Sequence, residues 1–184
     1  MRRAAAWGLA VALVAGAWAV TVLAPSDNAG ADAFTMRTTV GERVEGRNIA
    51  ATVLDVRAAR SIVSESGWRA DGTWLLVDLS ADAGVSQSQG LLTTATLRIG
   101  ERTFSASERG PDEMSIYREQ LVPGVPMTGS LLFELPDDAL VGHGTLRFAT
   151  STKPWGDSIV ELDIDLDALH VTPEITVADT GWAR

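Results

Sequence analysis

The chain has 184 residues, a net charge of −9 and no cysteine. The lack of cysteine excludes disulfides, zinc–thiolate sites and cysteine nucleophiles. With 46% hydrophobic and 21% charged residues, the chain is too apolar to be a disordered acidic tail. Beyond residue 24, 13 basic residues face 24 acidic ones. This balance argues against binding to nucleic acid and against lying flat on anionic lipid, and it favours a solvated acidic surface on one exported domain.

An apolar segment follows Met1, Arg2 and Arg3. Residues 4–24 hold no charge, and at 1.5 Å per residue they cover about 30 Å, the hydrocarbon thickness of a bilayer. Two arginines on the short side predict a cytoplasmic amino terminus and an exported remainder. We therefore interpret residues 1–24 as a cytoplasmic stub and a transmembrane signal anchor, and expect a single-pass protein of the cell membrane. Secretion after cleavage at the small-x-small pattern Ala31-Asp32-Ala33 is the alternative.

The next residues read as a linker. Residues 25–33 are small, polar and turn-forming, and we extend the flexible linker over residues 25–37. Nine residues span about 30 Å at full extension, so the following domain is expected to work close to the membrane. We expect this domain over residues 38–169, and a C-terminal tail over residues 170–184.

Short β-prone runs separated by Gly, Pro and Asp turns fill the domain. The expected strands are residues 48–59, 74–80, 91–99, 102–106, 127–135, 145–150 and 158–166. Residues 61–73 are expected to form a loop or a ragged hairpin, and residues 107–120 either a helix or a polar loop with one helical turn. No strand–helix rhythm is present, which predicts a mainly β chain with an antiparallel, immunoglobulin-like β-sandwich.

The hydrophobic pattern predicts which side chains face the core. Residues 74–80 are nearly all apolar, which is typical of a strand buried on both faces. Residues 127–135 lie between Pro126 and Pro136 and are expected to form the central strand, with an inward face of Met127, Gly129, Leu131, Phe133 and Leu135. For residues 158–166, the expected inward set is Val160, Leu162, Ile164 and Leu166.

The order of these signals resembles a known family. It runs from Val40-Gly41-Glu42 through the strand ending at Arg57, then Gly72 to Leu79, Leu97 to Gly100, and Leu121-Val122-Pro123-Gly124 to Phe133-Glu134-Leu135-Pro136. The pattern is similar to the immunoglobulin-like extracellular domains of Gram-positive bacteria, a domain-of-unknown-function family related in fold to the mycobacterial immunoprotective extracellular antigen. The resemblance covers residues 38–167 and implies an exported sandwich, often on a lipid or helical anchor, with no catalytic residues.

The candidate metal ligands in the sequence are carboxylates and histidines. Glu161, Asp163, Asp165 and Asp167 alternate along one expected strand. Alternate side chains of a strand stand about 6.8 Å apart, too far for all four to hold one ion, so we interpret them as a solvated face, with cation binding left open. His143 and His170 have no second ligand at helical or hairpin spacing. We therefore predict no metal and no cofactor.

The sequence also predicts that the protein is not an enzyme. It contains no Gly-x-Ser-x-Gly elbow, no Ser-x-x-Lys pair, no phosphate loop and no dinucleotide fingerprint. Trp68, Trp155 and Trp182 stand among polar residues, where aromatic side chains either make contacts to a partner or a sugar ring, or cover the edge of the core. We take these three as the candidate contact residues.

The leading hypothesis is a membrane-anchored, extracytoplasmic sandwich that acts through protein contacts. It would be an accessory subunit of an envelope or transport complex, bound to the bilayer by its N-terminal helix and to a protein partner at the outer membrane face. The alternative is a module that binds glycan or cell wall through the tryptophans. Glu174 to Val177 form a β-prone run in the tail, which either pairs with a sheet edge of the domain or engages a partner.

Overall fold

The computed structural model describes residues 7–8, 13–16, 18, 33–151 and 156–183. The chain divides into two compact units, Met1–Asp32 and Ala33–Arg184. The described residues of the first unit have a helical backbone. Most of the expected membrane span, residues 4–24, lies outside the described residues. Among those that are described, no helix has both the length and the hydropathy needed to cross a membrane.

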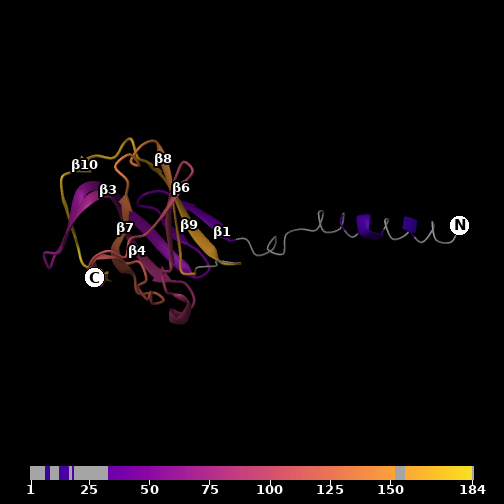
Figure 1. Ribbon diagram of the computed structural model, residues 1–184. Helices are drawn as coiled ribbons and strands as arrows, with labels where there is room; N and C mark the ends of the chain where they lie inside the picture. Colours follow the sequence, from indigo (N-terminus) through magenta and orange to yellow (C-terminus); the bar gives the residue numbers. More distant parts are fainter. Residues whose placement is uncertain (1–6, 9–12, 17, 19–32, 152–155, 184) are drawn as a thin grey trace. The chain divides into compact units, whose positions relative to one another are not determined.

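The second unit is built from two β-sheets (Figure 1). One sheet has five strands, all antiparallel to their neighbours except for the parallel pair β1 and β9. In order across the sheet, these strands are β1 (Phe34–Thr38), β9 (Ser158–Asp165), β8 (His143–Ala149), β5 (Thr94–Ile99) and β6 (Arg102–Ser105). The first of them begins at Phe34, inside the range 25–37 that the sequence assigned to a linker.

The other sheet has seven strands. Its main path is β10 (Val171–Thr172), β3 (Ile49–Ser64), β4 (Arg69–Ala83), β7 (Met127–Leu135) and β12 (Gly181–Trp182), and β2 (Arg43–Glu45) and β11 (Ile175–Val177) also pair with β3. The structure thus confirms a mainly β, largely antiparallel sandwich. The central strand is β4 and not β7, since β7 has only the two-residue β12 as its second neighbour.

The long hairpin of β3 and β4 was only partly predicted. Residues 61–73 were expected to form a loop or a ragged hairpin, and the structure has the hairpin, in which β3 continues to Ser64 and β4 begins at Arg69. The two strands extend beyond the expected bounds 48–59 and 74–80, because Ile62 and Ala70 are paired and buried. Gly67, at φ 92°, makes the turn between the two strands.

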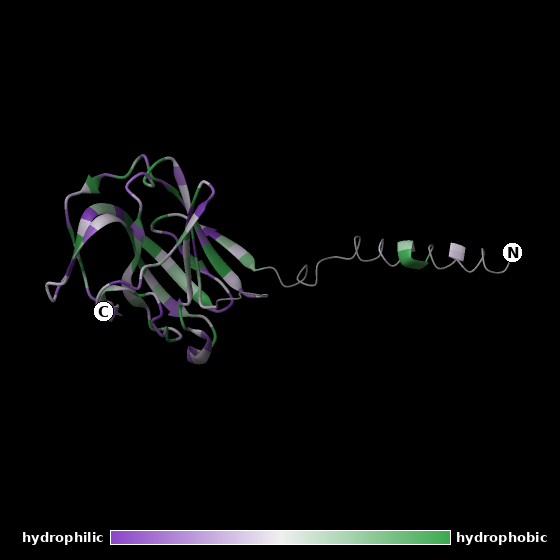
Figure 2. Cartoon of the chain, viewed as in Figure 1, coloured by the Kyte–Doolittle hydropathy of each residue, from purple (hydrophilic) through white to green (hydrophobic). Residues whose placement is uncertain are grey.

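Alternation along the strands builds the main core, as Figure 2 shows in the mixture of hydrophobic and hydrophilic residues along the strands. The inward face expected for β7 is confirmed, because Met127, Leu131, Phe133 and Leu135 are buried in this core. The inward set of β9 is confirmed in the same way. Residues 107–120 form the polar loop with one helical turn, a 3₁₀ turn over Asp112–Met114.

A second core lies on the other face of β4. Leu75, Val77 and Leu79 point into the main core. Trp74 and Leu76, on the opposite face, belong to a separate buried cluster. This confirms the prediction of a strand buried on both faces. The second core is completed by Ala70 of the same strand, by Ala59 and Ile62 of β3, and by residues far away in sequence: Met114, Leu132, Ile175 and Val177.

The C-terminal residues close the second core. We call residues 171–183 the strap. It pairs with β3 through β10 and β11 at one edge of the sheet, and with β7 through β12 at the other edge. The amide of Thr180 donates to the carbonyl of Glu113 at 2.6 Å in between. The segment expected to be a tail is therefore part of the folded unit, and the sheet-edge pairing expected for it is the one that is present.

Candidate functional site

The three tryptophans proposed from the sequence are placed differently. Trp68 is half-buried and packs on the second core beside Met114. A Cβ on Gly110 would meet its ring at 3.0 Å. Trp182 is 49% exposed in β12. Trp155 lies outside the described residues. The structure thus gives Trp68 a place at the edge of the core, and leaves Trp182 available for contacts.

Two acidic side chains of β9, those of Glu161 and Asp163, bind other side chains of the protein. Glu161 is buried, and its carboxylate lies 2.6 Å from a guanidinium nitrogen of Arg147 and 3.4 Å from that of Arg37. Asp163 accepts a hydrogen bond from the hydroxyl of Thr145 at 3.0 Å. In the part of the chain that the structure describes, no group of three or more His, Asp or Glu residues is arranged to hold a metal ion.

The histidines lie in separate places. His143 begins β8, where it is exposed and opposite Asp165 in the register. The sequence had predicted that this strand begins at residue 145. His170 is exposed immediately before β10.

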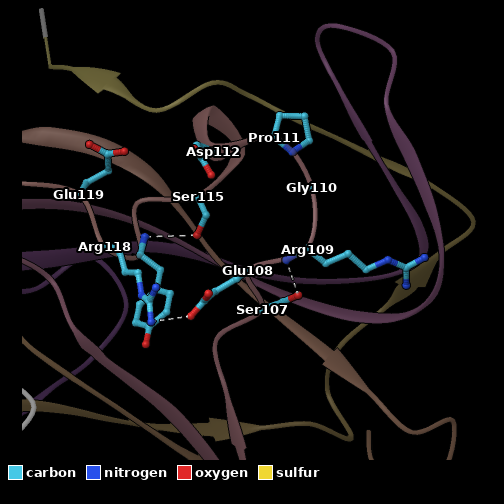
Figure 3. A pocket seen from close by; sticks show the side chains of 10 residues that line it. Ser107, Glu108, Arg109, Gly110, Pro111, Asp112, Ser115, Arg118 and Glu119 are labelled. Atoms are coloured by element: carbon cyan, nitrogen blue, oxygen red, sulfur yellow. Dashed lines mark hydrogen bonds and ion pairs between the residues drawn. The ribbon is translucent and has the colours of Figure 1, made fainter.

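One polar site in the structure is a site that the sequence did not single out. Residues 107–119 border a polar cavity of 360 Å³, which we call the loop site (Figure 3). Backbone hydrogen bonds hold this segment at both ends. The amide of Ser107 donates to Leu132 in β7 at 2.7 Å, and the amide of Arg118 donates to Leu92 at 2.8 Å. The loop site is therefore attached at its first end to β7 and at its last end to Leu92, which precedes β5.

Charged side chains of both signs line the loop site. Arg118 and Glu108 point toward one another in Figure 3 and form an ion pair at 2.9 Å. Arg109 reaches out of the loop to Glu134 in β7 at 2.6 Å. Asp112 and Glu119 add two further carboxylates to the lining. All four paired groups are at least 40% exposed, so the pairs contribute little to stability and are open to exchange with an external partner.

The backbone at Arg118 is strained. Its φ is 68°, and it is the one non-glycine residue with positive φ in the described part of the chain. A bulky side chain in this conformation costs on the order of 1 kcal/mol. The strain is maintained by the bond of its amide to Leu92 and by its guanidinium, which lies 5.7 Å from the centre of the Tyr117 ring. The conformation fixes the direction in which Arg118 faces the loop site.

A smaller cavity of 240 Å³ lies between the strap and the sheet. Arg57 and Asp78 line it and form an ion pair at 2.6 Å. The hydroxyl of Ser130 also donates to Asp78 at 2.5 Å. These polar groups bind one another beneath Ala178 and Asp179 of the strap. The cavity therefore belongs to the contact between the strap and the sheet.

Sequence reasoning missed the loop site for a specific reason. Residues 107–120 were left open between a helix and a polar loop with one helical turn, and the structure has the loop. A positive φ at an arginine has no sequence signal, since this region of conformational space favours Gly, Asn and Asp. The cavity depends on contacts with β7 and Leu92 that are distant in sequence.

No family model matches the chain, and no curated protein matches it. Three solved structures are similar. The ycdA protein of Bacillus subtilis, provisionally described as a lipoprotein, has 15% identity and a TM-score of 0.49, and the match covers 68% of this chain but only 38% of that protein. An uncharacterised β-sandwich protein of Clostridium difficile has 12% identity and a TM-score of 0.48 over 73% and 97% of the two chains. The yjhA protein of Bacillus subtilis has 19% identity and a TM-score of 0.42 over 68% and 99%.

Proposed function

We propose that this protein is a membrane-anchored, extracytoplasmic β-sandwich that acts without catalysis, as an interaction or accessory subunit of an envelope or transport complex. In this proposal residues 4–24 anchor the chain in the cell membrane, with the amino terminus in the cytoplasm. The loop site is the surface that binds the protein partner. Membership of the immunoglobulin-like extracellular family of Gram-positive bacteria is part of the same proposal.

The strained backbone of Arg118 is the observation that carries the assignment of the loop site. Conformations that cost free energy persist where the surrounding structure imposes them, and they gather at binding and switching sites. Here the strain holds an exposed arginine, whose charge partner Glu108 is 55% exposed. An external carboxylate can therefore replace Glu108 without removing a buried partner.

The lining of the loop site selects the kind of ligand. It is polar, carries two arginines and several carboxylates, and is not an enclosed apolar cavity. Small-molecule sites are mostly apolar and enclosed, whereas alternating charges on an open surface are typical of the rim of a protein interface. We therefore assign a protein segment with charges of both signs as the partner.

Photo-crosslinking in intact cells tests this proposal. A photoreactive amino acid is placed at Asp112 in the loop site, and the control carries it at Asp138, which is exposed in the loop between β7 and β8. We expect one reproducible crosslinked membrane protein from position 112 and none from position 138. The crosslink should weaken when Arg118→Ala is added, since this change removes the arginine that the strain positions.

Two results would contradict the proposal. Absence of any crosslink from position 112 would remove the loop site as the partner surface. A chain released from membranes by alkaline carbonate would refute the anchor. The strap is left intact in this design, because its removal would disturb the fold itself.

Among the described residues, Trp182 is the one that supports the glycan alternative. Trp182 is 49% exposed, and an exposed indole stacks on sugar rings. Binding of the full chain to purified cell wall, compared with Trp182→Ala, tests it. Equal retention of the two proteins would remove Trp182 from such a role.

A further inference from the structure

We propose that one end of the second unit rests on the surface of the bilayer through exposed apolar side chains. We call this end the linker pole. It comprises Phe34, residues 84–91 after β4, residues 121–126 before β7, and Trp182. The inference rests on the proposed function in one respect, the anchoring of the chain by residues 4–24.

Hydrogen bonds connect the first half of the linker pole. The amide of Phe34 donates to the carbonyl of Asp157 at 2.8 Å, and the side chain of Asn48 donates to the carboxylate of Asp157 at 2.6 Å. The amide of Gly84 donates in turn to the carbonyl of Asn48 at 2.9 Å. Phe34, the first residue of β1 in one sheet, and Val85, which follows β4 of the other sheet, are therefore at the same end of the sandwich.

Strand pairing connects the second half. Ala83, the last residue of β4, forms a bridge with Pro123. Trp182 pairs with Met127, the first residue of β7, and the amide of Ala183 donates to the carbonyl of Pro126 at 2.8 Å. Val125 and Trp182 thus continue the surface that begins at Phe34 and Val85.

Exposed apolar side chains concentrate at this pole. The described part of the second unit has eight large hydrophobic side chains that are exposed, and five of them lie here: Phe34, Val85, Leu91, Val125 and Trp182. Phe34 and Val85 are both 63% exposed. The other three, Val40, Leu54 and Val141, lie elsewhere on the unit. Several exposed apolar groups at one end of a soluble fold indicate a contact surface.

The two loop segments of the linker pole are also uncharged within an acidic chain. Residues 84–97 and 120–133 contain no Asp, Glu, Lys or Arg, although the chain has 39 such residues and a net charge of −9. Asp157 is buried there, and Arg47 is exposed with a bond to the carbonyl of Gly156. The acidic surface that would be repelled by lipid phosphates is thus absent from these two segments.

The position of the chain identifies lipid as the occupant. The polypeptide arrives at the linker pole at Ala33, and only residues 25–33 separate it from the apolar segment 4–24. These nine residues reach about 30 Å at most, which keeps the pole close to the bilayer surface. Phe and Trp side chains partition favourably into the boundary between lipid head groups and acyl chains.

Spin labelling of the full chain tests the inference directly, since the chain has no native cysteine. Single variants Val85→Cys, Val125→Cys and Val141→Cys are labelled with a nitroxide and reconstituted into phosphatidylcholine nanodiscs. All three positions are exposed valines, and Val141 is the control away from the pole. Collision with oxygen, which partitions into lipid, is compared with collision with a water-soluble nickel chelate. The oxygen-to-nickel ratio should be several-fold higher at positions 85 and 125 than at 141.

Each of the other outcomes contradicts the lipid contact, and one of them also contradicts the anchor. Equal ratios at the three positions, with the chain retained in the nanodisc, would overturn the lipid contact and leave the anchor standing. Labels at 85 and 125 that are shielded from both reagents and broadened by neighbouring labels would assign the pole to a second copy, which also overturns the inference. A chain that does not remain with the nanodisc would refute the anchor and the lipid contact together.

Discussion

The close approach of the strap to β7 makes Gly129→Ala a sensitive test of the fold. A Cβ at position 129 would lie 2.7 Å from the hydroxyl oxygen of Thr180 and 3.0 Å from the Cβ of Ile116. Ordinary contacts are about 3.5–4.0 Å, so the strap or the loop must move by roughly 1 Å. Overpacking of this kind costs about 1–3 kcal/mol. Alanine otherwise lowers the entropy of the unfolded chain, so a loss of stability would point to the clash.

Gly181→Ala is the matched control, because a Cβ at position 181 meets nothing within 4 Å. We expect its free energy of unfolding to stay within about 0.5 kcal/mol of the parent protein. Urea unfolding followed by circular dichroism measures both, and a loss of 2 kcal/mol moves the midpoint by roughly 1 M. Adding Thr180→Ala to Gly129→Ala should restore part of the loss, since it removes the nearest contact. Equal midpoints for the two glycine variants would refute the close approach of the strap.

Three further predictions concern the strap, the buried carboxylate and the loop site. Ending the chain after Leu169 should lower the free energy of unfolding by about 3–6 kcal/mol, because the buried side chains of Ile175 and Val177 are lost. Limited proteolysis should then cleave the hairpin of β3 and β4. A protease-resistant product would contradict this prediction. Glu161→Gln should cost about 1–3 kcal/mol in urea unfolding, because it removes the charge of a buried carboxylate that binds Arg147 and Arg37, whereas the exposed Asp163→Asn should be nearly neutral. Equal effects would show that burial is irrelevant here. Arg118→Gly should raise the thermal midpoint by relieving about 0.5–1 kcal/mol of strain and Arg118→Val should lower it; the opposite order would exclude a strained backbone.

The sequence predicted those parts of the fold that depend on local alternation. The inward faces of β7 and β9 followed from a period of two, and the two-sided burial of β4 followed from its continuous apolar run. The tip of the β3 and β4 hairpin was left open between a loop and a ragged hairpin, because Ile62 and Ala70 are buried by Ile175 and Val177 of the strap, which lie more than a hundred residues further along the chain. Such pairing has no local signature.

The candidate sites divide in the same way, into residues whose place depends on local sequence and residues whose place depends on distant contacts. Trp182 was expected as an exposed aromatic and is exposed. For Trp68 the structure favours the other alternative, since its ring covers the edge of the second core, which the strap helps to build. The loop site could not be predicted, since its shape depends on the backbone conformation of Arg118 and on bonds to β7 and Leu92.

The strap also has a consequence for the order of folding. It follows all the other strands in the chain, so it is synthesised after them, and Trp74 and Leu76 have no strap to cover them until then. Ile175 and Val177, which follow β9 in the chain, are needed to close the second core. The position of the strap in the chain thus delays closure of this core until the strands from β1 to β9 have been made.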